Sequence, residues 1–218
     1  MIKKIPLANK MKRQTHRDIA LAQDLIVLGV YRFFSNAVLH GGTSIWRCYN
    51  GERFSEDLDF YLFRDLRAIN LFFDYLLGES FTIKKKKLSE RSIYSELLYG
   101  RTSVRFEATF QKIKGVLLDY EKIDGNFISI YGLSAESLIK EKCVTYLKRK
   151  KIRDLYDVFF LLRFLRNVKE IREVYDLIKN YSKPVDEENL QTIIIQGIVP
   201  SSEGMMEYIK RKWENPNI

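Results

Sequence analysis

The stretch Leu39–Phe63 reads LHGGTSIWRCYNGERFSEDLDFYLF and decides the fold of this chain. It opens at the end of a short apolar run, where Gly41 and Gly42 predict a turn out of a strand. The hydroxyl residues after the glycines indicate a capped helix start, and Ile45–Tyr49 is then expected to form a short helix. The run LDFYLF, residues 58–63, predicts a second strand.

The two glycines carry the first sign of chemistry. A turn without side chains at the start of a helix lets backbone N–H groups approach a phosphate closely. Two hydroxyl residues follow and could add donors. The candidate phosphate-binding residues are therefore Gly41, Gly42, Thr43 and Ser44. His40, directly before them, could touch a phosphate or an acceptor, although a histidine at a strand end is more often structural.

The end of the same stretch offers a pair of carboxylates. Asp57 and Asp59 are two positions apart, so on a strand both point to the same face. Two like charges held together are unfavourable unless a cation neutralises them. Mg²⁺ is the usual solution, because it prefers oxygen ligands and keeps room for substrate phosphates.

A third carboxylate, Glu107, lies on the polar face of the strand-like run VRFEATF. If that strand neighbours the first, Asp57, Asp59 and Glu107 could hold two metal ions, one on the attacking oxygen and one on the leaving phosphate. Such a site performs phosphoryl or nucleotidyl transfer. A D-x-D pair or a Gly-Gly pair alone is weak, and the ordered combination is much stronger.

The rest of the chain divides into two halves by pattern. Helices are expected at 15–35 and 66–78, and strands within 81–110 and at 127–133. From Leu133 onward only helical patterns follow. The predicted fold is therefore α/β (α+β), with a mixed β-sheet domain over residues 1–132 followed by a helical domain over residues 133–218.

The first predicted helices of that second half carry a cluster of charges. Lys142, Arg149 and Arg153 would share one stripe of a continuous helix and suit a triphosphate. Asp154 and Asp157 are one turn apart and share a face. In the plainer interpretation, Arg153 and Asp157 form an ordinary ion pair on a solvated surface.

Composition narrows the class of protein. The 218 residues carry 37 Lys and Arg against 28 Asp and Glu, a net charge of +9, which favours a polyanionic partner. The chain has only two cysteines and two histidines, which argues against a disulfide scaffold, a zinc site or His-dependent hydrolysis. No apolar run is long enough to cross a bilayer, so no membrane association and a cytoplasmic location are expected.

The two motifs, GGTS…RFSEDLDF and EKCVTYLKRKKIRDLYDVFFLL (residues 141–162), resemble in their order the AbiEii/MenT-type toxin family of the nucleotidyltransferase superfamily. The resemblance implies a nucleotidyltransferase core, an NTP substrate and Mg²⁺, with Mn²⁺ as a substitute. It implies that Asp57, Asp59 and Glu107 bind metal and act in catalysis together with Asp154. It also implies that nucleotide is bound by Lys142, Arg149 and Arg153 besides the glycine segment.

The same resemblance implies the toxin of a toxin–antitoxin system, with an RNA acceptor, a tRNA 3′ end, and a cognate antitoxin protein as partners. Two alternatives stay open: a nucleotidyltransferase that modifies a small molecule or protein hydroxyl, and a non-enzymatic nucleic-acid-binding protein. Base stacking is expected from the helical half, at Tyr146, Tyr156 and Arg149. Lys84–Lys87 could contact RNA or only protect a strand edge. The sequence does not decide the NTP or the oligomeric state.

Overall fold

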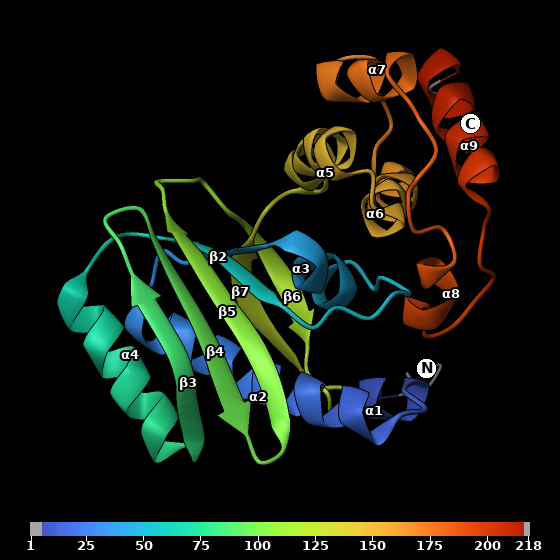
Figure 1. Cartoon of the computed structure of the whole chain (residues 1–218). Helices are drawn as coiled ribbons and strands as arrows, with labels where there is room; N and C mark the ends of the chain where they lie inside the picture. The colour runs from blue at the N-terminus through green and yellow to red at the C-terminus, as the bar shows by residue number, and fades with distance from the viewer. Residues whose placement is uncertain (1–5, 216–218) are drawn as a thin grey trace. The chain divides into compact units, whose positions relative to one another are not determined.

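The protein is described by a computed structural model that covers residues 6–215. Its contacts divide the chain into two compact units (Figure 1). The α/β unit comprises the residues up to Asn50 together with Phe54–Leu133, and the helical unit comprises Gly51–Arg53 together with the residues from Ser134 onward. Within residues 6–215, none of the helices combines the length and apolar character needed to cross a membrane.

The α/β unit is built on a mixed sheet whose seven strands within the described residues lie in the order β3-β4-β5-β2-β1-β7-β6. Parallel pairs join β2 to β5 and β1 to β7, and the other neighbours are antiparallel. The predicted mixed α/β fold is thereby confirmed. The strands are β1 (Val38–His40), β2 (Leu58–Leu62), β3 (Phe81–Leu88), β4 (Ser92–Tyr99), β5 (Thr102–Phe110), β6 (Val116–Glu121) and β7 (Phe127–Gly132).

The sheet has one apolar face, which alternation along the strands produces. On β2, Leu58, Phe60 and Leu62 are buried, while the residues between them are partly exposed. Helices cover this face: α2 (Gln14–Phe33) passes behind the strands in Figure 1, and α4 (Leu66–Gly78) packs beside it. The Phe72 ring of α4 lies 5.1 Å from the Phe106 ring of β5. The opposite face of β2 and β5 carries the polar side chains. A short helix, α1 (Leu7–Lys10), precedes α2.

The predicted turn at the two glycines is wrong. Helix α3 (Gly41–Cys48) begins at Gly41 itself, with no side chain capping its N-terminus. Gly41 has a φ of 71°, which turns the chain from β1 directly into the helix and leaves no need for a loop. Strand β6 is a second difference, because its sequence VLLDYE does not alternate and the patterns predict no strand there.

The helical unit begins with α5 (Ala135–Arg149) and α6 (Ile152–Leu161), which are separate helices. Lys150 adopts a left-handed φ of 51° between them. The single stripe through Lys142, Arg149 and Arg153 was expected only for a continuous helix, and the helix is not continuous, so that condition is not met. The later elements are the 3-10 turn η1 (Leu162–Phe164) and the helices α7 (Arg172–Lys179), α8 (Asn189–Ile193) and α9 (Ser202–Glu214).

A three-residue segment from between α3 and β2, which we call the strap (Gly51–Arg53), packs with the helical unit. The N–H of Ile195 donates to the carbonyl of Glu52 at 2.8 Å, and Arg53 forms a bridge with Ile194. The strap ends four positions before Asp57, so a single boundary in the sequence does not describe the two units.

Candidate active site

The predicted carboxylates lie on neighbouring strands. Asp57 directly precedes β2, Asp59 lies on β2 and Glu107 lies on β5. The register places Asp59 opposite Glu107 on one side and opposite His40 of β1 on the other. Paired residues of adjacent strands point to the same face about 5 Å apart. We call this line of residues, His40–Asp59–Glu107, together with Asp57 beside it, the carboxylate row.

Gly41 brings the start of α3 against this row. A Cβ at Gly41 would lie 3.0 Å from the Asp59 Cγ and would overlap its carboxylate oxygen. The positive φ of Gly41 adds a second reason for glycine at this position. The first turn of a helix has free N–H groups, which attract anions. The structure thus sets a helix start with free N–H groups beside a carboxylate.

The two predicted hydroxyl donors are buried within the protein. The Thr43 hydroxyl donates to the backbone carbonyl of Asp57, and the side chains of Thr43 and Ser44 are fully buried. Thr43 therefore holds the carboxylate segment in the structure, and its hydroxyl does not face outward to a phosphate. Among the predicted phosphate-binding groups, the backbone N–H groups of the helix start are the ones in position.

Gln23 of α2 fixes the segment that leads to Asp57. Its Nε2 donates to the carbonyls of Ser55 and Glu56, at 2.9 and 3.0 Å. The side chain is fully buried. The sequence analysis missed this residue, although a glutamine among the apolar residues of a long amphipathic helix was a usable signal.

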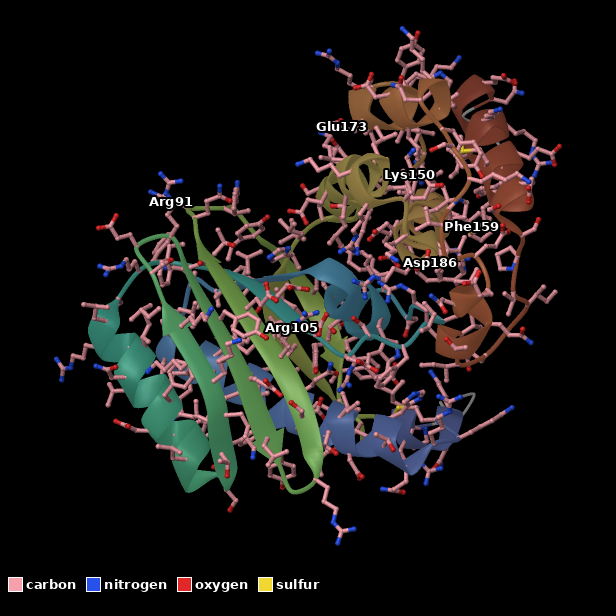
Figure 2. All side chains as sticks on the ribbon, viewed as in Figure 1. Arg91, Arg105, Lys150, Phe159, Glu173 and Asp186 are labelled. Carbon is pink, nitrogen blue, oxygen red and sulfur yellow. The ribbon has the colours of Figure 1, made fainter. Side chains whose placement is uncertain are left out.

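Arg105, on the same face of β5 as Glu107, also escaped the sequence analysis (Figure 2). Its guanidinium makes a two-pronged contact with Asp57, with Nε 3.1 Å from Oδ1, and Nε lies 3.2 Å from Oε1 of Glu107. Hydrogen bonds to Asp57 raise the pKa of Arg105 above its ordinary value. Its position two residues before Glu107 on a strand was the available signal.

Glu107 shows that negative charge is concentrated here. Burial and the neighbouring Asp59 raise the pKa of Glu107, and Asp57 adds to this effect, while Arg105 opposes it. Within residues 6–215, no three Asp, Glu, His or Cys side chains converge closely enough to hold a metal ion as they stand. The donor set nevertheless fits Mg²⁺ chemically, because these are hard oxygen ligands in excess over the nearby cation. To bind the ion, the Asp57 carboxylate would give up its contact with the Arg105 guanidinium.

A buried network anchors α3 to the rest of the unit. The Arg47 guanidinium of α3 pairs with Asp24 of α2 and donates from Nε to the carbonyl of Glu121 at 2.7 Å. Asp24 also accepts from the Tyr120 hydroxyl at 3.1 Å. Because Arg47 is only 1% exposed, its charge is tolerated only with these partners. The network holds the helix whose first residue meets Asp59.

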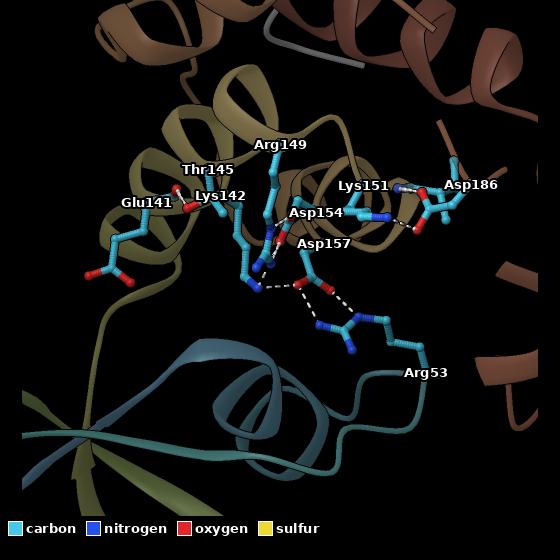
Figure 3. Close-up of polar contacts among 10 residues, drawn as sticks. Arg53, Glu141, Lys142, Thr145, Arg149, Lys151, Asp154, Asp157 and Asp186 are labelled. Atoms are coloured by element: carbon cyan, nitrogen blue, oxygen red, sulfur yellow. Dashed lines mark hydrogen bonds and ion pairs between the residues drawn. The ribbon is translucent and has the colours of Figure 1, made fainter. Parts of the chain in front are cut away.

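The helical unit contains a second group of charges, at Lys142, Asp154 and Asp157, joined by Arg149 and Arg53 (Figure 3). We call these five residues the buried ion cluster, after the four of them that are buried; the fifth, Arg149, has a side chain that is 41% exposed. Lys142 Nζ lies 2.7 Å from Asp157 Oδ2 and 3.3 Å from Asp154 Oδ1. The strap supplies Arg53, whose Nε and Nη2 donate to the two carboxylate oxygens of Asp157 at 2.5 and 2.6 Å.

The negative charges of the cluster are compensated by its own cations. Burial would raise the pKa of Asp157, but Arg53 and Lys142 outweigh this effect and lower it. The alternative of an ordinary ion pair between Arg153 and Asp157 is wrong, because Arg53 and Lys142 take both oxygens of Asp157. Three cations and two carboxylates leave the cluster with a formal charge of +1.

Arg149 and Arg153 also line a cavity of about 380 Å³ in the helical unit. Lys151 and Asp186 lie on the same wall, and Asp186 accepts from the N–H of Ile152 at 2.8 Å. Three cations around one cavity make it the candidate anion site of this unit.

The expectation that Tyr146 and Tyr156 stack on a base is wrong. Tyr146 is 0% exposed and donates to the carbonyl of Ser182 at 2.6 Å, and Tyr156 is 3% exposed. Both rings are core residues, and neither presents a face to a ligand. His40 stacks on Tyr61 of β2, with ring centroids 4.0 Å apart.

A helix that starts on a glycine beside paired carboxylates, set on a mixed sheet, is the arrangement expected from the resemblance to nucleotidyltransferases. A family model described as "Nucleotidyl transferase AbiEii toxin, Type IV TA system" matches residues 28–199. The chain belongs to this family. The predicted enzyme class and the resemblance to toxin nucleotidyltransferases are thus confirmed.

Individual proteins are similar to this chain in sequence or in fold. An uncharacterized protein, aq_aa25 of Aquifex aeolicus (strain VF5), is 26% identical over 214 residues, which are 94% of this chain and 91% of that protein. JHP933 from Helicobacter pylori has a TM-score of 0.57 at 16% identity, covering 91% of both chains. The nucleotidyltransferase toxin MenT4 (Rv2826c) from Mycobacterium tuberculosis H37Rv has a TM-score of 0.59 at 17% identity, covering 92% of this chain and 84% of that chain.

Proposed function

We propose that this enzyme is a Mg²⁺-dependent toxin that transfers a nucleotide from an NTP to a hydroxyl of an RNA, the 3′ end of a tRNA, in the cytoplasm. A cognate antitoxin would control it, as the toxin–antitoxin family description suggests. The observation that carries the proposal is the register of β2 with β5, which sets Asp59 beside Glu107 and next to the start of α3.

Each carboxylate has a proposed role. Asp57 and Asp59 hold Mg²⁺, and Glu107 orients the incoming hydroxyl. When bound, Mg²⁺ would stabilise negative charge on the attacking and leaving oxygens. The N–H groups at the start of α3 bind phosphate oxygens, and the fixed backbone around Asp57 means that little has to move during the reaction.

The helical unit has a proposed share in nucleotide binding through Lys142, Arg149 and Arg153. Asp154 positions both Lys142 and Arg149, since it contacts Lys142 Nζ at 3.3 Å and Arg149 Nε at 2.6 Å. The cavity lined by Arg149 and Arg153 supports binding of an anion there.

An RNA acceptor is favoured by the net charge of +9, because phosphate contacts draw on Lys and Arg. A small molecule or a protein hydroxyl as acceptor would use the same carboxylates without needing this charge. Membership of a nucleotidyltransferase family rules out the alternative that the protein only binds nucleic acid.

The test is incubation of the full-length protein with each labelled NTP, Mg²⁺ and total cellular RNA. We expect a labelled band of tRNA size. Asp59→Asn should lower the transfer rate by about a thousandfold or more, because it removes a charged metal ligand. Asp119→Asn is the matched control, since Asp119 lies on β6, away from the carboxylate row, and should keep the wild-type rate.

Label on protein or on a small molecule alone would reject the RNA acceptor. Full activity of Asp59→Asn would reject the metal assignment. Growth arrest on expression, relieved by Asp59→Asn and not by Asp119→Asn, would tie the toxicity to nucleotide transfer.

A further inference from the structure

The carboxylate row continues across the sheet beyond Glu107. Glu107 pairs with Tyr94 of β4, and Tyr94 pairs with Lys87 of β3. The row therefore runs Asp59, Glu107, Tyr94, Lys87 on one face. With a strand spacing of about 5 Å, Tyr94 lies one strand from Glu107 and Lys87 lies two strands from it.

A second row lies beside the first. Lys85 pairs with Glu96, Glu96 pairs with Arg105, and Arg105 contacts Asp57. The Lys85 Nζ is 5.5 Å from the centroid of the Tyr94 ring. Lys85 and Lys87 are exposed, and Tyr94 is half-buried. An aromatic ring is thus flanked by two cations on the open face of the sheet.

A bulge in β3 sets which lysines reach this face. The register shifts between Ile83 and Lys85, which leaves Lys84 as the extra residue. Lys85 and Lys87 then share the face of Tyr94, while Lys86 turns to the helix side, 3.9 Å from the Phe73 ring of α4. Four consecutive lysines therefore have different surroundings.

We propose that Lys85, Lys87 and Tyr94 form the surface that binds the single-stranded end of the RNA acceptor, resting on the function proposed above. Tyr94 stacks on a base next to the reacting nucleotide, and the two lysines bind the phosphates that follow. A sheet face with a partly exposed aromatic ring and nearby cations is suited to single-stranded RNA, because stacking tolerates any base and the cations neutralise the backbone. The carboxylates at the other end of the row repel phosphate and leave room for the terminal hydroxyl alone.

Edge protection is the competing explanation, because β3 is the outermost strand and lysines discourage pairing with other chains. That role needs charge on the strand but not a particular face. It predicts that Lys86 matters as much as its neighbours and that Tyr94 does not matter.

The experiment measures fluorescence anisotropy of a labelled short single-stranded RNA with the full-length protein, over a salt series and in a chelator so that no transfer occurs. We expect Lys85→Gln/Lys87→Gln to make the negative slope of log affinity against log salt shallower by about 1.4, at about 0.7 for each phosphate contact. Lys86→Gln, the matched control, should leave the slope unchanged. Tyr94→Leu should weaken binding about tenfold, and Tyr94→Phe should bind as the wild type does.

Equal slopes for the double variant and the wild type, or an equal loss in Lys86→Gln, would overturn this surface. Urea unfolding of each variant separates a binding effect from a folding effect. The labelled-NTP assay separates the two proposals: transfer to RNA by the wild type together with unchanged RNA binding by the double variant rejects the surface and keeps the function. A wild type that neither binds nor labels RNA rejects both.

Discussion

The carboxylate row of the α/β unit and the buried ion cluster of the helical unit both join aspartates to arginines, yet they treat charge differently. In the row, Asp57 and Glu107 share Arg105, whose side chain is 43% exposed, and burial together with neighbouring negative charge raises the pKa of Glu107. In the cluster, Asp157 is fully enclosed by two cations that lower its pKa.

The difference distinguishes a group of charges that can bind a ligand from a group that stabilises the fold. A cluster whose charges are paired with one another stabilises a buried structure, because removing one member leaves the others buried without a partner. A group with excess negative charge at a partly open surface is costly by itself and is stabilised when a cation arrives. We therefore read the cluster as mainly structural around Asp157 and the row as the centre of reaction.

The largest effect on stability should come from Asp157→Ala. It leaves Arg53 and Lys142 buried without their main partner and should cost about 3–5 kcal/mol of unfolding free energy. Asp176→Ala is the control in the same unit, because Asp176 forms an exposed pair with Arg172 at 3.7 Å. That change should cost less than about 1 kcal/mol in urea unfolding. Equal losses for the two variants would break the distinction drawn above.

Gly41→Ala should act on the reaction more than on the fold. The added Cβ would overlap the Asp59 carboxylate, and the alanine would have to adopt a φ of 71°. The resulting shift of α3 is expected to lower the rate of nucleotide transfer by about a hundredfold. Gly100→Ala has a φ of 58° but open space around its Cβ, and it isolates the backbone strain. The labelled-NTP assay should show normal transfer for Gly100→Ala. A similar loss in both variants would mean that strain, and not the contact with Asp59, matters.

The smallest expected effect is that of Arg105→Gln, and it tests the carboxylate row most directly. Without Mg²⁺ the variant should be destabilised by less than about 1 kcal/mol, since the pair is partly exposed. Added Mg²⁺ should then raise its melting temperature more than that of the wild type, because Asp57 no longer has to release a guanidinium. Arg101→Gln, an exposed change in the β4–β5 turn, serves as the control. A smaller Mg²⁺ effect in Arg105→Gln than in the wild type would show that Arg105 assists the ion.

Several features could be predicted from short-range patterns. Alternation on β2 and β5 indicated which side chains are buried, and Gly78 ends α4 as predicted. These patterns depend on neighbours in the chain, so they survive without knowledge of the fold. The helical patterns on the two sides of Lys150 were predicted as successive helices, but the left-handed conformation of Lys150 between them was not, because a lysine seldom takes it and no glycine marks it.

The sequence by itself determined the class of the enzyme, the order of its two parts and the identity of Asp57, Asp59 and Glu107 as candidates, because spacing and side-chain chemistry are local properties. The tertiary structure alone decided which residues meet. The parallel register that sets Asp59 against Glu107, the use of Arg105 and Gln23 around Asp57, and the pairing of Asp157 with Arg53, 104 positions away, depend on strand order and on contacts between distant segments. No periodicity encodes those contacts, since they follow from packing the whole unit.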